Sequence, residues 1–234
     1  MDNAEEIAKE LNRGSTGFAA AEPPFEMPVW DHNVHFHQLL LGRCPPGAMH
    51  VLEVGCGHGL LSRRLAERVG SVDALDADAS VLREAEKHVA GKNIRFICGD
   101  FLEVDLPAAH YDMITAVASL HHMDAHKALA KMKILLRPGG VLSILGLYRG
   151  RTLMDGVFAT VSVPVDWFYL FRHRRVTSVE PHRTRPPDMT LAQIRTAAKL
   201  LLPGVVIRRH LLWRYSLFWQ KPVVEKGAES GSPA

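Results

Sequence analysis

Short apolar runs alternate with segments of helical apolar spacing between residues 50 and 148. Each short run is bounded by turn residues, so buried strands are expected at 50–55, 72–77, 94–99, 111–119 and 141–148. Helices are expected at 60–69, 80–90 and 125–136, the last ended by the Arg-Pro-Gly-Gly stretch at 137–140. This alternation predicts an α/β domain with a parallel sheet that is covered on both faces.

The pattern changes after Tyr148. Residues 151–171 are apolar but are interrupted by two aspartates and a proline, which argues against a transmembrane span. A helix is expected at 190–204, with Thr190 as its N-cap. The strand-like runs 205–212 and 214–220 are predicted to pair and complete the sheet.

Length and composition limit the number of domains, the class of partner and the cellular compartment that are expected. A chain of 234 residues fits one domain, and a net charge of +3 does not by itself indicate a nucleic-acid partner. The three cysteines form no Cys-x-x-Cys pair, which favours a reducing compartment and argues against structural zinc. The polar N-terminus does not resemble a signal peptide, so a cytoplasmic location is expected.

A glycine-rich turn connects the first predicted strand to the first predicted helix. Gly55, Gly57 and Gly59 let the backbone approach a ligand closely, and the start of the helix offers free amide groups. Asp76 ends the second strand, where a carboxylate can accept both hydroxyls of a ribose. Asp100 ends the third strand, where it and Phe101 can flank an adenine ring.

Five ordered motifs carry a family resemblance. The segments VLEVGCGHG, ALDAD, CGDF, YDMITAVASLHHM and LRPGGVL resemble those of class I S-adenosylmethionine-dependent methyltransferases. The closest branch holds the ubiquinone/menaquinone C-methyltransferases and many small-molecule methyltransferases. The resemblance is strong over 48–148 and covers 190–221 in outline. It implies a doubly wound, Rossmann-like, mostly parallel seven-stranded sheet with an antiparallel last strand, an N-terminal helical lid and an insertion after the fifth strand.

The resemblance also implies a domain plan. Residues 1–47 would be a flexible N-terminus and helical lid, 48–223 the cofactor-binding domain and 224–234 a disordered tail. The insertion, 150–189, would be a wall of the substrate site or an oligomer contact, which leaves a homodimer open.

The resemblance implies roles for residues around the glycine turn. S-adenosylmethionine would be the cofactor, and no metal is expected. Glu53 would support its amino group, Asp76 would take the ribose hydroxyls, and Asp100 would border the adenine. The other implied cofactor-binding residues are Gly55, Cys56, Gly57, Gly59, Ala77, Phe101, Ala118 and Ser119.

Histidines are the candidates for a general base, should the acceptor have to lose a proton. His121 and His122 follow the fourth strand, at the edge where the transferred methyl group should lie. The alternative is that one of them caps the next helix or contacts the cofactor. Upstream, Trp30, Asn33 and His37 would share one face of a lid helix and face the sulfonium or the acceptor.

Several functions remain open from the sequence. A nicotinamide-binding domain also uses a glycine turn and a ribose carboxylate, but the glycine spacing here differs from G-x-G-x-x-G. The expected activity is methyl transfer to an O, N or C atom of a small molecule in bacterial secondary metabolism. An RNA methyltransferase, favoured by the late arginines, and a non-catalytic interaction protein that uses 151–171 are the alternatives.

Overall fold

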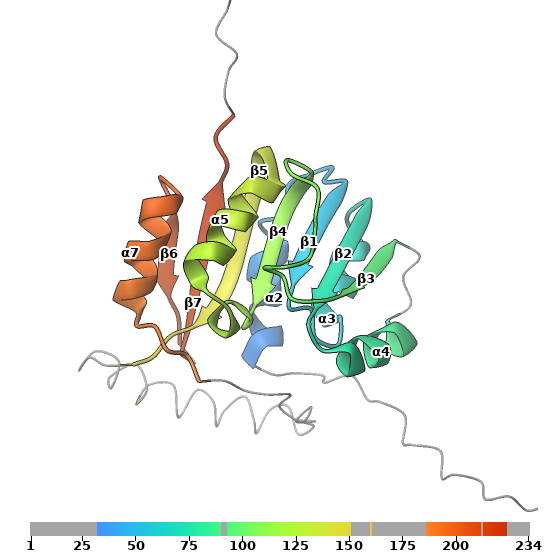
Figure 1. Ribbon diagram of the computed structural model, residues 1–234, viewed down its shortest axis with the longest axis horizontal. Coiled ribbons are helices and arrows are strands. Elements are labelled where there is room, and N and C mark those ends of the chain that lie inside the picture. The colour runs from blue at the N-terminus through green and yellow to red at the C-terminus, as the bar shows by residue number, and fades with distance from the viewer. Residues whose placement is uncertain (1–31, 90–92, 151–159, 161–185, 212, 224–234) are drawn as a thin grey trace, which may run out of the picture.

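The computed structural model describes residues 32–89, 93–150, 160, 186–211 and 213–223, and these form one seven-stranded sheet (Figure 1). The strand order is β3-β2-β1-β4-β5-β7-β6. Neighbours from β3 to β5 are parallel, and β7 is antiparallel to both β5 and β6, as predicted. The strands are β1 (His50–Val54), β2 (Ser71–Asp76), β3 (Ile94–Cys98), β4 (Tyr111–Val117), β5 (Leu136–Leu147), β6 (Val206–Arg209) and β7 (Arg214–Gln220).

Helices cover both faces of the sheet (Figure 1). Buried side chains of α5 and α7 pack on one face, and those of α2 and α3 pack on the other. The described helices are α2 (His32–Leu41), α3 (Leu60–Ala66), α4 (Ala79–His88), the 3₁₀ turn η1 (Leu120–His122), α5 (Ala125–Leu135) and α7 (Leu191–Leu201). Strands joined through helices in this way give the doubly wound arrangement predicted from the sequence.

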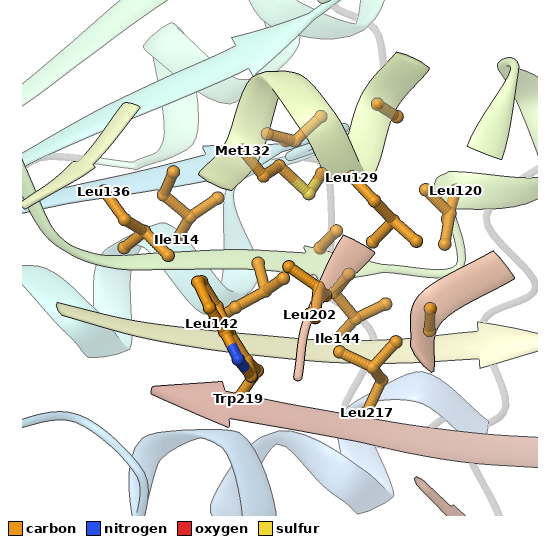
Figure 2. Packing of buried hydrophobic residues seen from close by; sticks show 14 of the residues in the cluster. Ile114, Leu120, Leu129, Met132, Leu136, Leu142, Ile144, Leu202, Leu217 and Trp219 are labelled. Carbon is orange, nitrogen blue, oxygen red and sulfur yellow. The ribbon is translucent and has the colours of Figure 1, made fainter. Parts of the chain in front are cut away.

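The larger apolar core lies between the sheet and α5 (Figure 2). Leu129 and Met132 of α5 meet Ile114 of β4 and Leu142 of β5, and all four are buried. Burial of each such side chain stabilises the fold by roughly 1.5–3 kcal/mol. The central strands are apolar on both faces because α2 and α3 cover the opposite side, where Leu40, Leu61 and Leu65 are buried.

Polar side chains cap the N-termini of α4, α5 and α7. Asp78 accepts hydrogen bonds from two amides of α4, and Asp124 accepts one from the Lys127 amide of α5. Thr190 and Gln193 form a capping box at the start of α7. The predicted N-cap at Thr190 is therefore confirmed.

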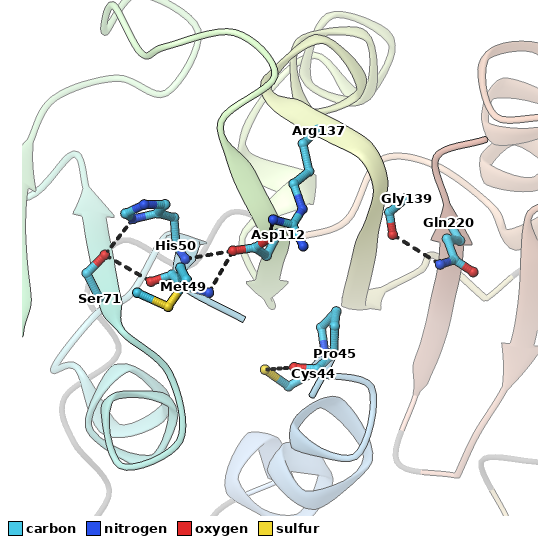
Figure 3. A network of polar contacts seen from close by, with 9 residues as sticks. All are labelled: Cys44, Pro45, Met49, His50, Ser71, Asp112, Arg137, Gly139 and Gln220. Carbon is cyan, nitrogen blue, oxygen red and sulfur yellow. Dashed lines mark hydrogen bonds and ion pairs between the residues drawn. The ribbon is translucent and has the colours of Figure 1, made fainter. Parts of the chain in front are cut away.

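A network at the amino edge of the sheet fixes β1 against β4 (Figure 3). The carboxylate of Asp112 is fully buried and accepts from the backbone amides of Met49 (2.7 Å) and His50 (2.8 Å). It also forms an ion pair with Arg137. A buried carboxylate satisfied in this way holds the strand register at the edge opposite the predicted site.

Several predicted boundaries differ from the structure by a few residues, and the differences in α3 and β5 have clear causes. Helix α3 ends at Ala66 rather than residue 69, because the amides of Arg68 and Val69 both turn back to the carbonyl of Leu65. Strand β5 begins at Leu136 rather than 141, since Leu136 pairs with Tyr111 before a shift in register. The Pro-Gly-Gly stretch therefore lies inside an irregular strand and not in a loop.

Parts of the predicted domain plan lie outside the described residues. These are 1–31, with Trp30, most of the insertion, and the tail from 224. Helix α2 occupies the described portion of the predicted lid.

Candidate functional site

A cavity of about 1050 Å³ opens where the carboxyl ends of the parallel strands meet. Its described walls come from the ends of β1, β2, β3, β4 and β5, the start of β7, and helix α2. This is the edge where ligands bind in open α/β sheets. Predicted residues that line it are Asn33, Gly55, Gly57, Asp76, Ala77, Asp100, Phe101, Ala118, Ser119, His121 and His122.

The turn after β1 is pressed against the end of β4. Gly55 has a φ of +73°, and a Cβ atom there would overlap the side chain of Ser119. The amides of Gly55 and Cys56 both donate to the carbonyl of Leu75. Only glycine fits these conditions, so the turn brings bare backbone to the floor of the cavity.

Asp76 braces the same turn from β2. Its carboxylate accepts from the amide of Gly57 at 2.8 Å and from the amide of Asp78 at 3.0 Å. A carboxylate offers about four acceptor positions, so these two bonds leave capacity for hydroxyl donors from the cavity. Gly57 has a φ of +52°, and a Cβ atom there would meet nothing within 4 Å, so this backbone faces open space.

Cys56 and Gly59 pack against buried residues and do not face the cavity. The Cys56 thiol is buried in a small cluster with Ala74 and Leu82, and burial raises its pKa, so it stays protonated. Gly59 has a φ of +71° and precedes α3, with Val89 close to where its Cβ would lie. Neither residue lines the cavity, in contrast to Gly55 and Gly57.

Asp100 and Phe101 end the third strand side by side but in different environments. Asp100 is exposed, and its carboxylate accepts from the Leu102 amide at 2.8 Å. Phe101 is 2% exposed and packs into the main core, with the Lys131 ammonium 5.3 Å from its ring centre. Phe101 therefore offers the cavity little surface, because the core holds it in place.

Two residues at the end of β4 shape the middle of the cavity. Ala118 has a φ of +51°, a conformation that L-residues seldom adopt, and its amide donates to Leu145. The Ser119 hydroxyl donates to the Val54 carbonyl at 2.6 Å. This side-chain-to-backbone hydrogen bond thus joins the ends of β1 and β4 next to the glycine turn.

Glu53 lies below the cavity and is 2% exposed. Its carboxyl group accepts a short hydrogen bond from the Ser62 hydroxyl of α3. Burial raises the pKa of Glu53 to about 8, against the hydrogen bond from Ser62, which lowers it. The Asp76 charge raises it further. Glu53 is consequently protonated at neutral pH in the protein without ligand.

The two histidines of η1 lie against each other at the cavity wall, with their rings tilted. The ring centres of His121 and His122 are 4.0 Å apart with 39° between the planes. The turn forms because the amide of His122 donates to the carbonyl of Ser119. Both residues follow β4 and line the cavity, as does Met123.

Helix α2 places its two predicted residues differently. Asn33 lines the cavity, and its side-chain oxygen accepts from the Arg214 guanidinium. His37 is 4% exposed and is absent from the described cavity wall, as the apolar residues around it pack against the sheet. The third member of that predicted face, Trp30, lies outside the described residues.

Arg214 is the main residue of the site that the sequence analysis missed. It begins β7 and lines the cavity although it is only 8% exposed. Its role depends on Asn33, 181 residues earlier, so no local pattern could reveal it. Pro186 and Pro187, which lie in the predicted insertion, also line the cavity, as does His58 of the glycine turn, which was not predicted.

The described residues show neither a metal-binding group nor a helix that could span a membrane. No group of three or more His, Cys, Asp or Glu side chains there is arranged to hold a metal ion. None of the helices in the described ranges is long and apolar enough to cross a membrane.

Comparison with known proteins gives the family. A model described as "Methyltransferase domain" matches residues 51–140. An uncharacterized methyltransferase of Mycobacterium tuberculosis is 37% identical over 198 residues, which are 83% of this chain and 98% of that protein. This chain belongs to the class I S-adenosylmethionine-dependent methyltransferases.

Two further matches are more distant. A ubiquinone biosynthesis O-methyltransferase of Coxiella burnetii is 35% identical over 96 residues, covering 40% of this chain and 41% of that one. A SAM-dependent methyltransferase structure from Aquifex aeolicus aligns with a TM-score of 0.55 at 17% identity, covering 79% and 88% of the two chains. The structural match supports the predicted fold.

The cavity fits the cofactor of this methyltransferase family. S-adenosylmethionine carries a ribose, an adenine and an amino acid group, and the cavity wall combines bare glycine backbone with carboxylates at the ends of β2 and β3. The open space beside Gly57 is where backbone can approach such a ligand.

The two glycines of the turn should respond differently to replacement by alanine. Gly55→Ala forces a methyl group into Ser119, so we expect the free energy of unfolding to fall by about 3 kcal/mol or more. Gly57→Ala meets no protein atom and should lose only about 1–2 kcal/mol. Its methyl group enters the cavity, so the affinity for S-adenosylhomocysteine should fall at least tenfold.

Urea unfolding and calorimetric titration with S-adenosylhomocysteine measure these two effects. Equal stabilities for the two variants would contradict the packing of Gly55 against Ser119. Wild-type affinity in Gly57→Ala would show that this backbone does not contact the cofactor.

The raised pKa of Glu53 makes stability depend on pH. The folded protein holds this proton up to about pH 8, whereas the unfolded chain releases it near the ordinary value of 4.5. The folded state therefore binds more protons in this window, and stability should fall as pH rises from about 4.5 to 8. Glu53→Gln should flatten that part of the profile in urea unfolding.

The exposed residue Glu86 of α4 provides the control. Glu86→Gln should leave the slope of the wild-type profile unchanged. An equally steep slope in Glu53→Gln would rule out Glu53 as its source.

Proposed function

We propose that this methyltransferase transfers the methyl group of S-adenosylmethionine to an O, N or C atom of a small-molecule acceptor in bacterial secondary metabolism. The cavity supports this proposal most directly. Its volume of about 1050 Å³ slightly exceeds the usual range for small-ligand sites, about 300–1,000 Å³, so a cofactor leaves space for a compact acceptor. The Coxiella relative, named for ubiquinone biosynthesis, is in line with a small acceptor. The three cysteines are free, which fits a cytoplasmic setting.

We propose the roles that the family resemblance implies for the cofactor residues, and the geometry of the cavity supports them. Asp76 would receive the ribose hydroxyls while it braces Gly57, and Ala77 would pack near the adenine. Asp100 would border the adenine from the end of β3. Ala118 and Ser119 would face the amino acid group. Glu53 would support the amino group from below, and Cys56 and Gly59 would act through the shape of the turn.

When bound, S-adenosylmethionine supplies a methyl group that a nucleophile can attack in line, with the positively charged sulfur as the leaving group. The chain has to align the acceptor with that methyl group and exclude water. Orientation of this kind accounts for about 7–11 kcal/mol of a reaction barrier in favourable cases. The walls formed by the ends of β4 and β5 and by α2 supply it here.

We propose His121 as the base that takes a proton from the acceptor, with His122 lying against it as the partner that orients the ring. Both line the cavity just beyond β4. His37 of α2, which is buried and lies outside the described cavity wall, would serve as a positioning residue for this helix, which also carries Asn33.

Transfer of a labelled methyl group tests the proposed function. The protein is incubated with methyl-tritiated S-adenosylmethionine and, separately, with a small-molecule bacterial extract, total RNA and dialysed cell protein. We expect label in the small-molecule pool only. Label in RNA that nuclease removes would replace the proposal with an RNA methyltransferase. Bound cofactor without transfer to any pool would indicate a non-catalytic protein.

Replacement of His121 tests its role as the base. His121→Gln keeps a polar side chain at the wall but loses the proton acceptor, so kcat should fall by roughly 100- to 10,000-fold. Affinity for S-adenosylhomocysteine should stay within about threefold of the wild type, since general-base action does not enter cofactor binding.

The exposed His126 of α5 gives a matched control, and His126→Gln should leave kcat unchanged. A kcat of wild-type size in His121→Gln would remove this residue from the chemistry. The same measurement on His122→Gln separates the two rings, because an orienting partner should lower kcat less than the base itself.

A further inference from the structure

A buried serine of α3 contacts the carboxyl group beneath the glycine turn. Ser62 is fully buried and shares the inner face of the helix with Leu61 and Leu65. A hydroxyl buried on an apolar helix face is costly unless it is hydrogen-bonded, and a helical serine can bond to the carbonyl four residues earlier. The Ser62 hydroxyl instead donates to the side chain of Glu53 on β1. The donor is thus directed at this carboxyl group and not used within the helix.

Glu53 lies next to the floor of the cavity. It directly precedes Val54 and Gly55, which both line the cavity, and it is 2% exposed. A carboxyl group that has lost its proton offers about four acceptor positions, and Ser62 uses one of them. A donor group of a ligand at the floor of the cavity can therefore bind another.

The groups around Glu53 decide whether its carboxyl group is neutral or ionised. Burial raises its pKa to about 8, the hydrogen bond from Ser62 of α3 lowers the pKa, and the negative charge of Asp76 of β2 raises it. Cys56 of the turn is a buried thiol that stays protonated, and the register partner on β4 is the neutral Thr115. Ser62 thus favours the ionised form of Glu53 in surroundings that otherwise favour the neutral form.

A cationic ligand group shifts this balance. The amino acid group of the family's cofactor carries an amino group, which is largely protonated below about pH 7.5. Attraction between opposite charges favours the ionised carboxylate. Because Glu53 holds a proton at neutral pH, this proton and the ammonium group compete for one carboxyl group.

We propose that Ser62 is a positioning residue for the cofactor, and that its hydroxyl holds Glu53 ready to exchange a proton for the amino group of S-adenosylmethionine. In this exchange the O–H bond of the Glu53 carboxyl group breaks, the proton passes to the solvent, and the carboxylate pairs with the ammonium group. Cofactor binding consequently releases one proton. The inference rests on the proposed function, in which Glu53 supports the cofactor amino group from below.

Calorimetry in two buffers of different ionisation enthalpy counts the protons released on binding. S-adenosylhomocysteine keeps the amino acid group, whereas 5′-methylthioadenosine has the adenine and ribose without it. At about pH 6.5, where Glu53 is protonated, the wild type should release about one proton with S-adenosylhomocysteine and none with methylthioadenosine. Glu53→Gln should bind either ligand without release.

Ser62→Ala tests the positioning role. Loss of a hydrogen bond to a charged group should weaken S-adenosylhomocysteine roughly 10- to 100-fold at about pH 6.5, with methylthioadenosine affected less than about threefold. The loss should shrink at about pH 9, because less of the Glu53 proton then has to be displaced in either protein. A merely structural role of Ser62 would weaken both ligands alike and would not depend on pH.

Ser143→Ala provides the matched control. Ser143 is a fully buried serine of β5, and its replacement should leave the proton release and both affinities unchanged. Ser62→Cys keeps a weaker donor of similar size, so its loss should be intermediate. This variant also decides the question should Ser62→Ala fail to fold, as judged by circular dichroism.

Three results would each overturn the inference. They are binding of S-adenosylhomocysteine to the wild type without proton release at about pH 6.5, equal weakening of the two ligands in Ser62→Ala, and a loss that is the same at both pH values.

Transfer of the labelled methyl group is a separate measurement of the proposed function. Label in the small-molecule pool without proton release on cofactor binding would refute the role of Ser62 and uphold the proposed function. Proton release together with label in RNA would do the reverse.

Discussion

The site depends on the close contact between the turn after β1 and the end of β4. No side chain fits at Gly55, because Ser119 occupies the space where a Cβ atom would lie. The Ser119 hydroxyl donates back to the last residue of β1, Val54, so the contact is bonded as well as packed. Asp76 holds the far side of the turn through the Gly57 amide. Backbone of three neighbouring strands is thereby fixed around one point at which a ligand can approach.

The polar side chains at the amino and carboxyl ends of the parallel strands differ in what they contact. At the amino edge, the buried carboxylate of Asp112 satisfies two amides and an arginine, so its polar groups are used within the protein (Figure 3). At the carboxyl edge, carboxylates and rings line a cavity. Between the two ends of the strands, buried residues of α5 pack on one face of the sheet and those of α3 on the other. This close packing makes the sheet rigid and holds the two sets of polar side chains apart.

Local signals explain why much of the fold, and the strand ends that line the cavity, could be predicted. The glycine turn, Asp76 and Asp100 each follow a short apolar strand, so their positions depend on a few neighbouring residues and on the rule that parallel strands end at one edge. The start of β5 at Leu136 was missed, because a Pro-Gly-Gly stretch is typical of a loop and only the pairing with Tyr111 makes it part of a strand. Arg214 was missed because its burial depends on Asn33.

Helix α2 and the start of β7 are physically coupled. Asn33 contacts Arg214, and Phe36, one turn later, packs near His210 of the same β6–β7 connection. Leu40 and Leu41 anchor the rest of α2 in the apolar core. A helix fixed at one end by apolar packing and joined at the other by polar bonds positions the guanidinium as much as it covers the cavity. The corner of the cavity between α2 and β7 thus rests on contacts between residues far apart in the sequence, whereas its central walls are the ends of neighbouring parallel strands.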